Sequence, residues 1–207
     1  EAASAPAPGH ERAREDSGGL DCQRIFQEFG SDLERYAFLR ELQDINETLF
    51  YATLVGNLEE LLPIVYTPTI GEAIERFSHE YNGARAVFLS IDHPELIEQS
   101  LRNYGLDAED VDLVVATDSE GILGIGDQGV GGIQICMGKK SLYTAAAGVD
   151  PDRMVSIVLD VGTDNLRLLN DELYLGERHA RVRGERYDEF VDAFVRAATT
   201  VFPNAMV

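Results

Sequence analysis

Tyr66 is the side chain of this sequence best placed for acid–base chemistry, because Pro63 and Pro68 lie on either side of it. Each proline fixes its own φ and pushes the preceding residue out of the α region, so this pattern predicts a phenol hydroxyl held on a rigid turn. The alternative is a helix that ends at a proline and carries the tyrosine as an anchored core residue. The segment by itself leaves both interpretations open.

A second candidate is the lysine pair that follows Gly138. A lysine desolvated in a closed cleft can fall far enough in pKa to act as a base, and a nearby tyrosine can then act as an acid. Lys139 and Lys140 are equally good candidates by residue type. Composition alone favours a surface position at the start of a helix for Lys139.

The glycine run Gly124–Gly129 matches the dinucleotide fingerprint GxGxxG by letter. A genuine fingerprint passes from strand to turn to helix, with an acidic residue about 20 positions later. Here Asp118–Gly121 and then Ile122-Leu123 are typical of a hairpin turn followed by a second strand. The context therefore favours a loop that does not bind a nucleotide.

Three further residues are candidates for binding a metal. Asp160 and Asp164 are two carboxylates on one loop after a strand, but with Asn165 beside them they are more typical of turn-forming and N-capping groups. His179 lies among arginines, and this setting favours a structural or interface role over a role as a ligand.

The chain divides by pattern into three parts. Residues 1–20 are rich in Ala, Pro, Gly, Ser and charge, which predicts a disordered tail. Residues 21–82 form a helical section in which Asp32 is expected to be an N-cap. The predicted helices run from Leu33 to Phe50, from Asn57 to Leu62 where Pro63 stops the helix, and from Gly71 to Tyr81.

Residues 83–207 alternate short apolar runs with helical patterns, which predicts an α/β domain. The fold class expected is an N-terminal helical section followed by an incomplete, mainly parallel sheet flanked by helices. The predicted strands are 86–91, 111–117 and 156–161, the predicted helices are 94–104 and 187–201, and 205–207 begins one more strand.

Composition excludes several classes of partner. Of the 207 residues, 37 are Asp or Glu and 17 are Lys or Arg, so the formal charge of −20 opposes binding to nucleic acid or to an anionic membrane. No apolar run approaches the roughly 18 residues of a membrane span, and the start lacks a signal-peptide pattern. With only Cys22 and Cys136, and no metal-ligand spacing around either, a cytoplasmic location is expected.

Six motifs in unbroken order resemble the malic enzyme family, including its malolactic relatives: LQDINETLFY, PIVYTPTIG, ILGIGDQGVGG, GKKSLYTAAAG, VLDVGTDN and LYLGERHARVRGERYDEFVDAF. The resemblance implies L-malate as substrate, NAD or NADP as hydride acceptor, and Mg or Mn. It implies that Tyr66 is the acid that protonates the enol of pyruvate and that Lys139 is the base that takes the hydroxyl proton of malate. Arg85 aligns with a family arginine near the cleft, and no role is assigned to it.

Two departures qualify this resemblance. Gly121 stands where many malic enzymes carry an arginine that clamps a malate carboxylate, and glutamate followed by glycine here resembles the malolactic branch. The family's Glu-Asp pair and third aspartate for the metal, and its nicotinamide domain, are expected beyond Val207, so the isolated chain is expected to be inactive. The alternatives are part of a malolactic enzyme, which converts malate to lactate, and a non-catalytic regulatory or oligomerisation module. In either enzyme the subunits are expected to form a homo-oligomer.

Overall fold

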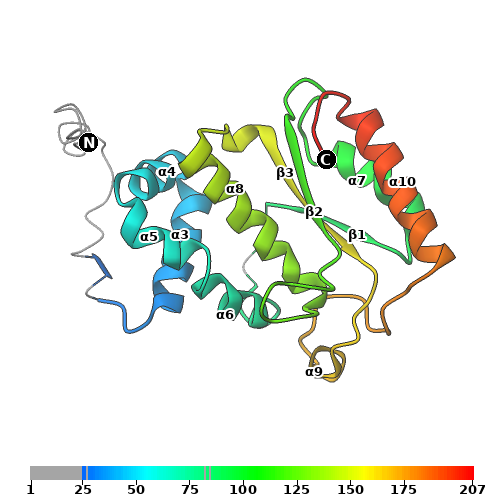
Figure 1. Ribbon diagram of the computed structural model, residues 1–207, viewed down its shortest axis with the longest axis horizontal. Helices are drawn as coiled ribbons and strands as arrows, with labels where there is room; N and C mark the ends of the chain where they lie inside the picture. The colour runs from blue at the N-terminus through cyan, green and yellow to red at the C-terminus, as the bar shows by residue number, and fades with distance from the viewer. Residues whose placement is uncertain (1–24, 27, 82, 84) are drawn as a thin grey trace, which may run out of the picture. The chain divides into compact units, whose positions relative to one another are not determined.

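The computed structural model describes residues 25, 26, 28–81, 83 and 85–207 (Figure 1). They fall into two compact units, the first ending at Thr69 and the second beginning at Ile70. The predicted tail at 1–20 lies outside the described residues. The division into a helical section ending at 82 and an α/β domain beginning at 83 stays a prediction.

The described part of the first unit contains three helices that pack on one another, α3 (Asp32–Ile45), α4 (Glu47–Gly56) and α5 (Leu58–Val65). The N-cap of α3 is Ser31, so the assignment of Asp32 as N-cap is wrong by one residue. Ser31 Oγ accepts the backbone N–H of Glu34 at 3.2 Å, and the Glu34 carboxylate accepts the N–H of Ser31 at 3.1 Å. This reciprocal capping box satisfies two amide groups that a helix start leaves without partners.

The single helix predicted from Leu33 to Phe50 is in fact two helices that meet at Asn46. Asn46 leaves the helical region, with φ −149° and ψ 83°, and its side chain accepts the N–H of Leu49 at 3.0 Å. Asparagine competes for backbone hydrogen bonds in this way, so it ends one helix and caps the next. The apolar spacing continues through the junction, which hides the break from a periodicity argument.

The predicted stop at Pro63 is also wrong, because α5 continues through this proline to Val65. A proline inside a helix removes the hydrogen bond to the carbonyl four residues earlier. That carbonyl belongs to Glu59, an exposed residue, so water can replace the lost donor. The next helix, α6 (Thr69–Glu75), is shorter than the predicted Gly71–Tyr81 and gives way to turns after Glu75.

The second unit contains a three-stranded sheet of β1 (Val87–Ser90), β2 (Leu113–Thr117) and β3 (Met154–Asp160). The strand order is β1-β3-β2 and both pairings are parallel, so the predicted α/β class and parallel sheet are confirmed. Every residue of the central strand β3 is buried, as expected for a strand covered on both faces.

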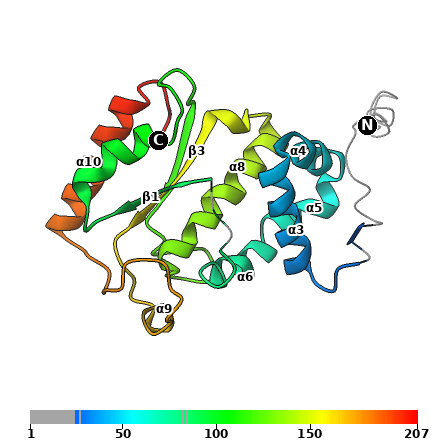
Figure 2. The same cartoon turned by 180° about the vertical axis from the view of Figure 1, so that it is seen from behind.

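Helices cover both faces of this sheet (Figures 1 and 2). On one face α7 (Ile97–Asn103) and α10 (Glu185–Val201) pack over a core that includes Val155, Ile157 and Leu159 of β3. On the other face α8 (Ile133–Ala147) packs against β2 and β3, with Ile133, Cys136 and Met137 around Val158. Side chains alternate between the two faces along a strand, so Asp160 lies on the α8 side.

Short elements complete this unit: η1 (Pro94–Leu96), η2 (Gly129–Gly132), η3 (Pro151–Arg153) and α9 (Leu166–Leu169). The strand expected to begin at 205 is reduced to one residue, because Met206 makes only an isolated parallel bridge to Leu113. Ile122-Leu123 is not a second strand, because Ile122 makes only an isolated antiparallel bridge to Gly126. Within the described part of the chain, no helix is long and apolar enough to cross a membrane.

Candidate functional site

Tyr66 is the residue at which helix α5 ends, in the first unit. Its N–H still donates to the carbonyl of Leu62 at 3.0 Å, and its φ of −132° and ψ of −147° then turn the chain out of the helix. The hydroxyl of Thr69 donates to the carbonyl of Pro63 at 2.9 Å and closes the turn, which contains a cis Thr67–Pro68 peptide bond. The side chain of Tyr66 is half-buried. A turn thus follows directly on a proline-containing helix, and that helix ends at Tyr66 and not at a proline.

Lys139 lies in the middle of helix α8, in the second unit. Composition alone favours a position at the start of a helix instead. The helix continues to Gly148, whose left-handed φ of 70° ends it. Lys139 is half-buried, whereas Lys140 retains only 8% of its exposed surface. Desolvation alone therefore does not single out Lys139, and the choice between the two lysines depends on the Gly138-Lys139 motif.

The glycine run is held by the carboxylate of Asp127. This group accepts the N–H of Gly129 at 3.0 Å, the hydroxyl of Thr163 at 2.8 Å and the N–H of Asp164 at 2.9 Å. Arg181 adds two donors, Nε at 3.1 Å and Nη2 at 2.9 Å. Burial opposes ionisation of Asp127, but these hydrogen bonds outweigh it and hold the pKa of the carboxyl below its usual range.

Arg181 and Asp127 form a buried ion pair, which we call the hub. The Arg181 side chain is 1% exposed, and its Nη1 also donates to the carbonyl of Asp118 at 2.8 Å. The hub thus fastens the loop after β2 to the loop after β3. Sequence analysis missed it, and the only signals were an aspartate inside a glycine run and a distant arginine of complementary charge.

Close packing explains Gly129, at the end of this run, and Gly132, which follows it. A Cβ on Gly129 would lie 2.0 Å from the hydroxyl of Tyr174, and one on Gly132 would lie 2.1 Å from Oγ of Ser119. At Gly124 and Gly126 a Cβ would meet no atom within 4 Å, so their positive φ of 85° and 73°, and not close packing, favours glycine there.

The carboxylates proposed from sequence as metal ligands are engaged elsewhere. Asp160 accepts the N–H of Gly162 at 3.1 Å and that of Glu177 at 2.8 Å, and burial raises its pKa. Asp164 accepts the N–H of Arg181 at 3.0 Å and pairs with Arg183 at 2.8 Å. The adjacent Asn165 caps α9 through the N–H of Arg167. These are the turn-forming and capping roles that the residue types favour.

The chain from residue 43 to residue 207 matches the model of the malic enzyme N-terminal domain. This chain belongs to the malic enzyme family. It is 52% identical over 188 residues to NAD-dependent malic enzyme 3 of Bacillus subtilis, covering 89% of this chain and 33% of that protein. It is 50% identical to the NAD-dependent malic enzyme of Sodalis glossinidius and 47% identical to that of Aeromonas hydrophila, each over 184 residues. These alignments cover 89% of this chain and 32% of each relative, so the chain spans about one third of their length.

Gly121 marks the departure from the malic enzyme pattern that the sequence indicates. A Cβ built on it meets no atom within 4 Å, so a Cβ is accommodated at this position. The neighbouring Glu120 pairs with Arg183 at 2.6 Å.

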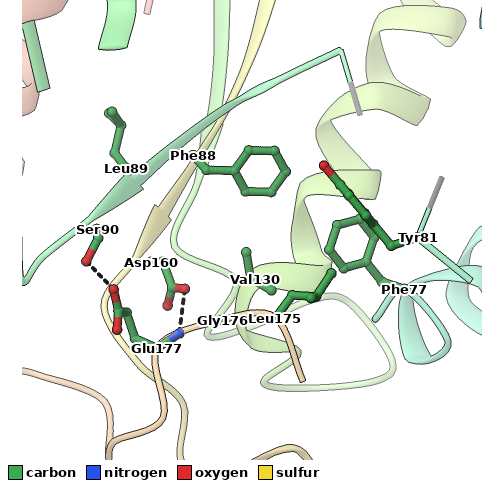
Figure 3. Close-up of a pocket in the computed structure, with 10 residues that line it drawn as sticks. All are labelled: Phe77, Tyr81, Phe88, Leu89, Ser90, Val130, Asp160, Leu175, Gly176 and Glu177. Carbon is green, nitrogen blue, oxygen red and sulfur yellow. Dashed lines mark hydrogen bonds between the residues drawn. The ribbon is translucent and has the colours of Figure 1, made fainter. Parts of the chain in front are cut away.

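A pocket of about 370 Å³ opens beside β1 in the second unit (Figure 3). Its apolar wall includes Phe77 and Phe88, whose ring centroids lie 6.5 Å apart, and its polar edge is formed by Ser90, Asp160 and Glu177. Lys139 is not among the lining residues. Sequence analysis did not single out this pocket, because its lining comes from segments up to 100 residues apart.

Proposed function

We propose that this chain is the N-terminal part of an NAD-dependent malic enzyme that converts L-malate to pyruvate and carbon dioxide. The observation that supports this most is the match over residues 43–207, which includes both the Tyr66 and the Lys139 motifs. The relatives at 47–52% identity are named NAD-dependent malic enzymes, which favours NAD over NADP.

In this proposal Lys139 and Tyr66 divide the proton transfers between them. The neutral Nζ of Lys139 takes the proton from the C2 hydroxyl of malate as that carbon is oxidised to a ketone. After the C4 carboxylate leaves as carbon dioxide, the Tyr66 hydroxyl donates a proton to C3 of the resulting enolate, which gives pyruvate. The proton that Lys139 took from malate then restores the phenol, so the two residues act as one acid–base unit.

We assign neither NAD nor the divalent cation of the malate reaction to the described residues of this chain. Tyr174 and Ser119 pack against Gly129 and Gly132, and the one described group of three metal-type ligands, Asp92, Glu177 and His179, lacks the three carboxylates that the resemblance implies. When bound to the complete enzyme, NAD would supply the hydride acceptor and the cation would supply positive charge at the malate oxygens.

The test compares charge-conserving substitutions at the two lysines in the gene product that carries this chain. Arginine does not give up its proton in proteins, so Lys139→Arg should lower kcat for malate oxidation by about 10²–10⁴-fold. Lys140→Arg is the matched control and should leave kcat near that of the unaltered enzyme. NADH formation from malate is the measurement.

Tyr66→Phe separates the acid from the base. It should block pyruvate formation but leave the reduction of oxaloacetate to malate by NADH, since that step adds no proton to C3. Lys139→Arg should impair both reactions. Equal activity of the two lysine variants, or full pyruvate formation by the tyrosine variant, would contradict the assignment.

Gly121 keeps a malolactic enzyme as the second candidate, because the expected arginine clamp is absent. The two activities differ in the product that accumulates from malate, which is lactate for a malolactic enzyme and pyruvate with NADH for a malic enzyme. We also propose a homo-oligomer, which light scattering of the purified gene product would test.

A further inference from the structure

Three metal-ligating side chains converge at the carboxyl ends of β1 and β3, away from the hub. Asp92 follows β1, and Glu177 and His179 lie in the loop that crosses the end of β3. One ligand atom from each of the three lies within 4.8 Å of the others. The carboxyl edge of a parallel sheet is where α/β folds commonly bind ligands.

One nitrogen of the His179 imidazole makes no hydrogen bond, although it is shielded from solvent. The other, Nδ1, lies 2.8 Å from the carbonyl oxygen of Ala180, which can only accept, so Nδ1 carries a proton. Nε2 faces Oδ2 of Asp92 at 3.4 Å, and the two form an ion pair only when the imidazole is protonated. When the ring is neutral, Nε2 carries the lone pair that a metal would take.

The distance of 3.4 Å between Nε2 of His179 and Oδ2 of Asp92 matches two ligands of one metal ion better than a direct hydrogen bond. In a tetrahedral zinc site with bonds of 2.0–2.1 Å, neighbouring ligand atoms lie about 3.3–3.4 Å apart. A bridging water would need about 2.8 Å to each atom, so the space suits a bare ion better than a solvent molecule. A cation here would satisfy two facing lone pairs at once.

Each of the three ligands is held by an outer partner on its other polar atom. Nδ1 of His179 binds the carbonyl of Ala180, Oδ1 of Asp92 accepts Arg186 at 2.6 Å, and Oε1 of Glu177 accepts the hydroxyl of Ser90 (Figure 3). Metal ligands are typically oriented by such second partners. In this arrangement one ligand atom of each side chain still lies within 4.8 Å of the other two.

The backbone around His179 fixes this geometry. Its carbonyl accepts the N–H of Thr163 at 3.0 Å, and a Cβ on Gly162 would lie 2.6 Å from Nδ1. Only a glycine at residue 162, with its φ of +83°, allows the imidazole to lie there. The ligand is thus positioned before any ion binds.

We propose that Asp92, Glu177 and His179 form a binding site for a zinc-type divalent cation. An imidazole nitrogen with two carboxylate oxygens selects zinc, or a similar transition metal, over magnesium and calcium. Three protein ligands leave a fourth position open. The site is independent of the proposed function, because neither Tyr66 nor Lys139 takes part in it.

Zinc titration of the metal-stripped 207-residue chain tests the site, with isothermal calorimetry as the measurement. We expect one Zn²⁺ per chain, unaffected by excess Mg²⁺, and a visible spectrum of tetrahedral type when Co²⁺ replaces zinc. His179→Gln and Glu177→Gln should each weaken binding by at least about tenfold, and Ser90→Ala by about tenfold through loss of an outer partner.

His93→Gln is the matched control, since His93 is exposed and interacts only with Glu95 in its own turn. It should bind zinc as the unaltered chain does. Circular dichroism of each metal-free variant establishes that it is folded. The proposal is overturned if the unaltered chain takes up no stoichiometric zinc, or if folded His179→Gln binds zinc as tightly as His93→Gln.

Discussion

Two charged clusters lie at the carboxyl end of the same sheet, and they differ in how completely their atoms are paired. In the hub, both oxygens of Asp127 and all the nitrogens of the Arg181 guanidinium have partners. In the cluster of Asp92, Glu177 and His179, each side chain has one polar atom engaged, and Nε2 of His179 makes no hydrogen bond. Full hydrogen bonding indicates a structural role, and a shielded imidazole nitrogen without a hydrogen bond, close to two carboxylates, suits a metal ligand.

The largest effect is expected when the positively charged side chain of the hub is removed. Arg181→Ala leaves Asp127 partly buried and unpaired, so it should lower the free energy of unfolding by about 3–5 kcal/mol. Arg183→Ala is the control, because Arg183 is 55% exposed and its ion pairs with Glu120 and Asp164 should contribute about 1 kcal/mol or less. Urea denaturation measures both, and equal losses would show that the hub is not the structural member of the pair.

A smaller effect is expected from filling the space beside the hub. Gly129→Ala places a Cβ against the Tyr174 hydroxyl and adopts a φ of +50° that alanine disfavours, so it should cost about 1–3 kcal/mol. Gly124 has a φ of +85°, but a Cβ there would meet no atom within 4 Å. The loss of stability in Gly124→Ala therefore measures the cost of the backbone conformation alone. Thermal unfolding compares the two, and an equal loss would show that the tyrosine does not require the glycine.

The smallest stability change is expected at the metal cluster. Arg186→Gln removes an exposed cation that pairs with Asp92, and should change the free energy of unfolding by about 1 kcal/mol or less. Zinc affinity should fall by up to about tenfold, because Asp92 loses the outer partner that orients it. Calorimetry measures the affinity, and an unchanged zinc affinity would separate Arg186 from the cluster.

Sequence patterns predicted the second unit well because its strands are continuous apolar runs. The runs at 86–91, 111–117 and 156–161 became β1, β2 and β3 within two residues at each end. Asn46 and Pro63 show where apolar periodicity fails to predict the ends of helices. The side-chain cap of Asn46 divides one predicted helix into two, and α5 continues through Pro63 because water can replace the lost hydrogen bond. Helix boundaries depend on such local hydrogen bonds, which apolar spacing does not report.

The site residues divide in the same way. The catalytic roles of Tyr66 and Lys139 were inferred from sequence motifs. They stay predictions, because no side-chain contact described in either unit decides them. The hub and the metal cluster were missed because residues such as Asp127 and Arg181, or Asp92 and His179, are far apart in the chain and meet only when the sheet has formed. His179 was interpreted as structural or at an interface because three arginines lie close to it in the sequence. The sequence does not show that carboxylates face it in the fold.

Cys136 gives this molecule a built-in reporter of transient opening. Its thiol is 1% exposed between α8 and β3, and burial raises its pKa to about 12. Since the thiolate is the reactive form, a maleimide or disulfide reagent should modify Cys136 only while α8 is lifted from the sheet. The labelling rate would therefore report how often the helix that carries Lys139 separates from its support, without any introduced probe.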